Sequence, residues 1–169
     1  LESVWTLRED YGIIARTAII GDGPEMGSLK TLASELELHD QVTFFGYVPD
    51  LRSVYEIMKK GRLCVVSTVE GGGGNLALVE AHGCGLPVVA FKADAGMDPE
   101  LINPGKSGLL VDFVDSPSSD GQALASAIAD LLKQPAKIEG MKEYVLSKAA
   151  ASGWDRISES YKAVFAAHT

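Results

Sequence analysis

Apolar and polar residues follow one another in blocks whose period switches between that of a helix and that of a buried strand. Residues 25–36 carry apolar side chains at every third or fourth position, which is typical of one helix face. Residues 87–91 are apolar almost throughout, as expected of a parallel strand covered on both faces. The pattern predicts, in order, helix 1–11, strand 15–20, helix 25–36, strand 41–45, helix 50–60, strand 63–67, helix 75–83, strand 87–91, a helical turn at 99–102, strand 108–111, and helices 122–134, 136–150 and 154–167.

Regular alternation of strands and helices predicts an α/β fold, in which right-handed crossovers build a Rossmann-like, doubly wound parallel sheet with helices on both faces. A helical C-terminal tail follows, and residues 1–169 form one domain. Ligands of such sheets bind beyond the carboxyl ends of the strands, so the loops at 21–24, 46–48, 68–75 and 93–99 should border the binding crevice. We expect 115–121, rich in Ser, Pro and Gly, to be only a polar loop.

Composition narrows the classes of function. The chain has 15 Lys and Arg against 23 Asp and Glu, a formal charge of −8, and no basic stripe, which argues against a nucleic-acid partner. Cys64 and Cys84 have no clustered histidines, so we expect no metal site and two reduced cysteines in a cytoplasmic protein. No apolar run approaches the ~18–20 residues of a membrane span.

The most informative segment is 65–91, which predicts a buried strand, a four-glycine loop, a helix and a second buried strand. Free backbone amides at a glycine loop and helix N-terminus attract phosphate, because the unpaired donors and the helix dipole favour negative charge. Glu80, inside that helix, can accept hydrogen bonds from a ribose diol. The segment therefore suggests a site for a nucleotide or nucleotide sugar.

Several motifs occur together in a fixed order: IIGDGPE at 19–25, VTFFGYVP at 42–49, VEAHGCGLPVV at 79–89, PELI at 99–102, GLLV at 108–111 and WDRI at 154–157. In this the chain resembles the C-terminal, donor-binding domain of the retaining glycosyltransferases with two Rossmann-like domains, the GT-B fold of glycosyl transferases group 1. The resemblance covers essentially the whole chain. Each motif is weak alone, but their shared order makes the resemblance specific.

The resemblance implies a role for each matching position. Glu80 would hold the ribose hydroxyls, and Glu70 would contact the donor sugar beside its anomeric carbon as the catalytic acidic residue. The remaining positions would contact the rest of the donor: Gly74, Asn75, Leu76 and Ala77 the diphosphate and sugar, Gly46, Tyr47 and Val48 the edge of the base, and Gly21 and Gly23 the floor of the cleft.

The chain departs from the family pattern in two places. Nine residues separate Glu70 from Glu80 where the family has seven, so either the loop bulges and returns Glu70 to the sugar, or that contact is altered. The family's preceding strand, with an Arg and a Lys that meet the diphosphate, has no counterpart here. We therefore expect a fragment that lacks the N-terminal acceptor domain and the first strand of its own sheet.

Some of these residues could instead have a purely structural role. The turn at 21–24 could simply join a strand to a helix, Asn75 could be a helix N-cap, and Tyr47 could only shape the cleft. His82 lies two positions past Glu80 and is expected to be a packing or surface residue, because the two point in different directions on a helix.

The sequence thus predicts a glycosyltransferase that transfers a glycosyl group from a nucleoside diphosphate sugar to a hydroxyl acceptor with retention, using no cofactor and no dedicated metal. The partners would be the nucleotide sugar and an acceptor held by the missing N-terminal domain, and any membrane association would come through the missing part. The alternatives are a nucleotide-sugar epimerase or phosphorylase on the same fold, or a non-catalytic nucleotide-binding module.

Overall fold

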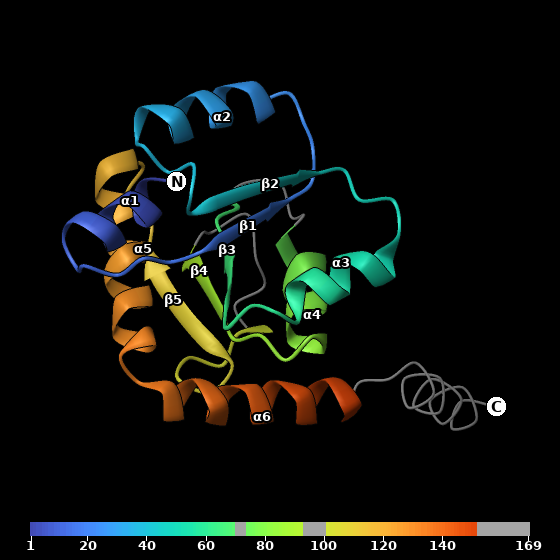
Figure 1. Cartoon of the computed structure of the whole chain (residues 1–169). Coiled ribbons are helices and arrows are strands. Elements are labelled where there is room, and N and C mark those ends of the chain that lie inside the picture. The colour runs from blue at the N-terminus through green and yellow to red at the C-terminus, as the bar shows by residue number, and fades with distance from the viewer. Residues whose placement is uncertain (70–73, 93–100, 152–169) are drawn as a thin grey trace.

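The structure, a computed structural model, describes residues 1–69, 74–92 and 101–151 of the 169-residue chain. Helices and strands alternate along it in the predicted order (Figure 1). The elements are α1 (Glu2–Glu9), β1 (Thr17–Ile20), α2 (Met26–Glu35), β2 (Val42–Gly46), α3 (Leu51–Met58), β3 (Cys64–Val66), α4 (Gly74–Gly83), β4 (Val88–Lys92), β5 (Gly108–Asp112), α5 (Pro117–Leu132) and α6 (Pro135–Ala151).

All the described strand pairs are parallel, as predicted, and they form two hydrogen-bonded sheets. β1 pairs with β2, and β3, β4 and β5 pair in that order. Within the described residues, no ladder hydrogen bonds join the two sheets. The apolar pattern alone did not reveal this separation, although the family resemblance led us to expect a sheet without its first strand.

The doubly wound character is clearest in β4, whose residues alternate between two cores. Val89 and Phe91 pack with residues of α5 and α6, whereas Val88 and Ala90 pack with residues of α4. Figure 1 shows α5 on one side of the β3–β5 sheet and α4 on the other. The apolar run of 87–91 therefore reports burial on both faces, which is what the sequence indicated.

The β1–β2 sheet has its own small core, made by Val4, Ala33, Leu38 and Val42. The N-terminal part of the chain is tied to the rest by α1, which packs against α5. At this contact a Cβ added to Gly121 would lie 2.6 Å from the Cβ of Glu2, so only glycine allows the two helices to approach so closely.

One prediction about the local structure was wrong. Residues 115–121 are not merely a loop, because α5 begins at Pro117, with Ser116 as its N-cap. Pro is favoured in the first helical turn, where its missing N–H is not needed. Asp120 is 6% exposed and accepts hydrogen bonds from the backbone N–H groups of Ser116 at 2.8 Å and Val114 at 3.0 Å, which fixes the start of the helix.

The predicted helix at 154–167, the predicted loop at 93–99 and the first two residues of the predicted turn at 99–102 lie outside the described residues. None of the helices in the described part of the chain combines the length and the hydropathy that a membrane span requires.

Candidate functional site

The carboxyl ends of β1 and β2 meet at a pair of glycines. The Gly21 amide donates a hydrogen bond of 2.9 Å to the Gly46 carbonyl, where the strand register shifts so that Ile20 lies opposite Gly46. Both glycines have positive φ, 125° and 65°, and a Cβ added to either would meet no atom within 4 Å. Backbone conformation rather than crowding thus requires glycine here. The structure brings together the residues predicted to line the floor of the cleft and the base.

The other members of these two loops are accessible. Tyr47 is 74% exposed and Val48 is half-buried. The Gly23 amide donates to the carboxylate of its neighbour Asp22 at 2.8 Å, so this amide already has an acceptor. A large exposed aromatic ring beside the Gly46 backbone is suited to contact with a planar base.

α4 begins at Gly74, one residue before the predicted start. Asn75 is therefore its second residue, so the expected N-cap role is wrong. Gly74, Asn75, Leu76 and Ala77 make its first turn, whose amides have no partner within a helix. Leu76 is 67% exposed and Ala77 is exposed, so this part of the turn is open to solvent.

Glu80 lies further along α4, between residues that anchor the helix. Leu78 and Ala81 are fully buried against β3 and β4, whereas the Glu80 side chain is half-buried. Its carboxylate oxygen Oε1 accepts a hydrogen bond of 3.2 Å from the hydroxyl of Tyr55 on α3. Glu80 thus has a defined environment at the face of the sheet, not that of a solvated surface acid.

Sequence reasoning missed Tyr55. It lies on the apolar face of α3 with Leu51, Val54 and Met58, and it is the member of that set with a polar tip. Burial, and then the Glu80 carboxylate, raise the pKa of its hydroxyl above the ordinary value, at which a tyrosine is already a neutral donor. A tyrosine on the apolar face of a helix was the available signal, because the hydroxyl of such a residue usually needs a partner.

The two cysteines lie near each other at the other end of α4, and both are free thiols. Burial, and then the neighbouring Cys84, raise the pKa of Cys64 to about 11. Burial also raises the pKa of Cys84, an effect that Lys59 partly opposes. Among the described residues, no group of three or more His, Cys, Asp or Glu side chains could hold a metal ion.

The position of positive charge follows from the topology. Lys59 and Lys60 follow α3, which returns to the amino ends of the strands, and Arg16 precedes β1. Lys92, in contrast, is the last residue of β4 and is exposed at the carboxyl end of the sheet. Of these four cations, Lys92 alone stands at the edge where ligands of such sheets bind.

His82 is a packing residue, as expected. Its Nε2 atom is buried and has no hydrogen-bond partner within the described residues. Burial lowers the pKa of the imidazole, and the backbone of Ser107 partly offsets this shift. The remaining predicted site residue, Glu70, lies outside the described residues together with the glycines at 71–73.

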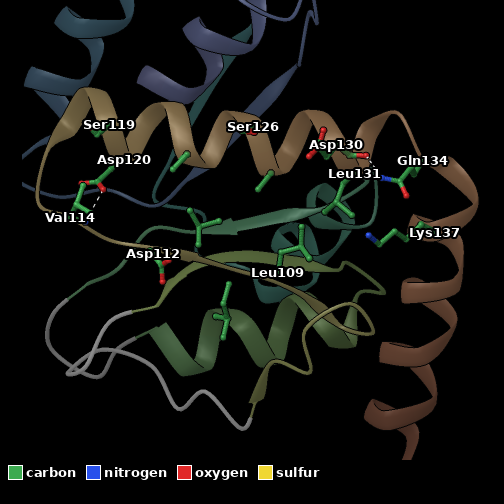
Figure 2. Close-up of a pocket in the computed structure, with 14 residues that line it drawn as sticks. Leu109, Asp112, Val114, Ser119, Asp120, Ser126, Asp130, Leu131, Gln134 and Lys137 are labelled. Atoms are coloured by element: carbon green, nitrogen blue, oxygen red, sulfur yellow. Dashed lines mark hydrogen bonds between the residues drawn. The ribbon is translucent and has the colours of Figure 1, made fainter.

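A separate groove of about 710 Å³ runs along β5 and α5 (Figure 2). It is bordered by side chains that include Asp112, Asp130 and Lys137. None of the predicted donor-site residues lines it, and it follows the outer edge of β5 rather than the loops after β1 to β3. This groove is therefore distinct from the candidate site.

Fold and site define the chain as a doubly wound α/β domain with glycine turns, an open helix N-terminus and one positioned carboxylate. Residues 1–148 match the family Glycosyl transferases group 1, and the chain belongs to that family.

Known proteins resemble the chain over most of its length. It is 31% identical over 150 residues to an exopolysaccharide phosphotransferase of Streptomyces coelicolor, covering 89% of this chain and 15% of that protein. It is 32% identical over 132 residues to a GDP-mannose-dependent phosphatidylinositol monomannoside mannosyltransferase of Mycolicibacterium smegmatis, covering 73% and 32%. The chain thus spans less than a third of either relative.

Solved structures confirm the Rossmann-like fold of the GT-B glycosyltransferases. The pneumococcal O-GlcNAc transferase GtfA, solved in complex with UDP and GlcNAc, superposes with a TM-score of 0.81 at 22% identity. The match covers 96% of this chain and 31% of that one.

Proposed function

We propose that this chain is the donor-binding domain of a glycosyltransferase that uses a nucleoside diphosphate sugar and retains the anomeric configuration. In the reaction an acceptor hydroxyl oxygen bonds to the anomeric carbon while the bond from that carbon to the diphosphate oxygen breaks. The proton of the hydroxyl passes to the departing nucleoside diphosphate. The chain's part is to bind and orient the donor and to stabilise the negative charge that develops on the leaving diphosphate.

The observation that carries this proposal is the placement of Glu80. It is a half-buried carboxylate on a helix whose N-terminal turn is open and lies at the carboxyl edge of the sheet. A carboxylate held at that depth is suited to accept hydrogen bonds from a ribose diol, since ionised acceptors make stronger hydrogen bonds. The names of relatives support the donor class, because one is GDP-mannose-dependent and another was solved with UDP.

The remaining parts of the donor have assigned places. The first turn of α4, from Gly74 to Ala77, would receive the diphosphate through its amides. Gly46, Tyr47 and Val48 would border the base, above a floor at Gly21 and Gly23. Glu70 would contact the sugar. Lys92 would supply positive charge at the diphosphate, because it lies at the same edge of the sheet.

We further propose that the working domain contains another parallel strand between β1 and β3. In the doubly wound dinucleotide fold the strand order is 3-2-1-4-5-6, and the pairs observed here correspond to 3-2 and 4-5-6, without the central strand. Each sheet has one unpaired edge at this point: among the described residues, β1 has no ladder partner on the side away from β2, and β3 has none on the side away from β4. Val65 of β3 is 40% exposed, whereas Val88 and Val89 of β4 are fully buried. We also propose that an N-terminal domain of the same enzyme binds the acceptor, and that the enzyme is cytoplasmic.

The first test is a screen of UDP, GDP and ADP against a protein that carries this chain together with the proposed central strand and acceptor domain. A ligand that binds the folded state raises its stability by RT ln(1 + [L]/Kd), about 2 kcal/mol at thirty-fold excess over Kd. We expect one nucleoside diphosphate to raise the melting temperature. A flat response to all three would overturn the proposal.

The second test separates the rival activities. Incubating that protein with the matching donor sugar and no acceptor should leave the sugar unchanged. An epimerised sugar would favour an epimerase. In a parallel incubation with added inorganic phosphate, formation of a sugar phosphate would favour a phosphorylase.

A further inference from the structure

The hydrogen bond between Tyr55 and Glu80 joins two helices that are distant in sequence. The Tyr55 hydroxyl donates to Oε1 of Glu80 at 3.2 Å, across the interface between α3 and α4. Both side chains are half-buried. This leaves the second carboxylate oxygen, Oε2, available as an acceptor.

We propose that Tyr55 is a positioning residue that fixes the Glu80 carboxylate and thereby sets the preference for a ribose over a 2′-deoxyribose. This inference rests on the proposed function. A glutamate has several rotatable bonds, and ordering a free side chain on binding costs affinity. The phenol removes part of this cost because it holds the carboxylate in one orientation before the ligand arrives.

Contacts at both ends of α3 fix this helix, so the Tyr55 hydroxyl has a defined position beside Glu80. At its start the Asp50 carboxylate accepts hydrogen bonds from the backbone N–H groups of Arg52 at 3.3 Å and Ser53 at 3.0 Å. At its end Met58 packs against the core cluster that contains Leu78 and Ala81 of α4. Tyr55 therefore sits between a capped helix start and a packed helix end.

The same helix follows directly on the loop predicted to border the base. Tyr47 and Val48 precede Asp50, the N-cap of α3. The hydrogen bond from Tyr55 to Glu80 consequently links the segment that would contact the base to the carboxylate that would contact the ribose. A nucleoside that contacts both would bind to groups whose relative position is already fixed.

Tyr55→Phe isolates the hydroxyl, because the ring and its packing are retained. Tyr144→Phe is a matched control: the Tyr144 hydroxyl, on α6, accepts a hydrogen bond of 3.3 Å from Asn103 Nδ2 rather than donating one to Glu80. The experiment measures dissociation constants for the best-binding nucleoside diphosphate and for its 2′-deoxy form. The proteins are the wild type, both Tyr→Phe variants and Glu80→Gln, each carrying the proposed central strand and acceptor domain.

We expect Tyr55→Phe to weaken ribonucleotide binding about three- to tenfold, the effect of one hydrogen bond, and to weaken the 2′-deoxy form less, because that ligand keeps only its 3′-hydroxyl as a donor to Glu80. Tyr144→Phe should behave as the wild type, and Glu80→Gln should remove the preference for ribose. A wild-type ratio in Tyr55→Phe, or an equal loss for both nucleotides, would overturn the positioning role alone. Absence of nucleotide binding by the wild type would overturn the proposed function as well.

Discussion

The backbone of Gly21 is hydrogen-bonded to that of Gly46, with 2.9 Å between amide nitrogen and carbonyl oxygen, so the turns after β1 and β2 form one unit. Each glycine has a φ in the left-handed range, and neither is crowded by neighbouring atoms. The shape of this part of the crevice therefore depends on backbone conformations that other residues adopt only with strain.

Gly46→Ala should reduce the free energy of unfolding by about 1–2 kcal/mol, the cost of a left-handed conformation for a residue with a Cβ. Urea denaturation measures this loss. Gly23→Ala is the control, because Gly23 has neither a positive φ nor an atom within 4 Å of an added Cβ, and its stability should stay near that of the wild type. Equal effects of the two substitutions would contradict the explanation.

Asp120→Ala should destabilise the domain by about 2 kcal/mol, since two backbone N–H groups, of Val114 and Ser116, lose a buried acceptor. Asp130→Ala removes an exposed carboxylate from the same helix and serves as the control. Urea unfolding of both variants gives the comparison. The capping role of Asp120 is wrong if the two losses are alike.

Stability should fall as the pH drops below about 6.5, the ordinary pKa of histidine, because His82 has a lowered pKa in the folded state. The unfolded chain then takes up a proton at this residue before the folded chain does, and stability declines until the folded His82 is also protonated. Unfolding at pH 7.5 and 5.5 should show a smaller difference for His82→Gln than for the wild type. His39→Gln, at an exposed position, should keep the wild-type difference.

Lys92→Met should weaken nucleoside diphosphate binding about three- to fivefold at low salt and make binding less sensitive to salt, if Lys92 faces the diphosphate. Lys60→Met removes the same charge at the opposite edge of the sheet and should have little effect. Calorimetry at two salt concentrations measures both. A larger effect of Lys60→Met would place the anion elsewhere.

Much of the fold could be predicted from local pattern. The run at 87–91 identified a doubly buried strand, and the glycine loop before Glu80 indicated where α4 begins, because these features depend on residues close in sequence. The start of α5 was missed, since Ser, Pro and Gly at 116–121 are typical of loops. The hydrogen bonds that fix this start, from the backbone of Val114 and Ser116 to the Asp120 carboxylate, are not visible in the local composition.

The contact between Tyr55 and Glu80 was also beyond local pattern. The two residues belong to different helices, 25 positions apart in the chain, and only the tertiary fold brings them together. The break between the two sheets could not be inferred from β1 or β3 alone, because it depends on which strands are neighbours. Only the family resemblance led us to expect that a strand is missing.

The most direct test concerns Glu80. Isothermal titration of the best-binding nucleoside diphosphate should be carried out on the wild type and on Glu80→Ala, each in a protein that carries the proposed central strand and acceptor domain. Loss of hydrogen bonds to a charged acceptor should raise the dissociation constant about 10- to 100-fold, with unfolding by urea little changed. An unaltered dissociation constant would contradict the assignment of this carboxylate to the ribose.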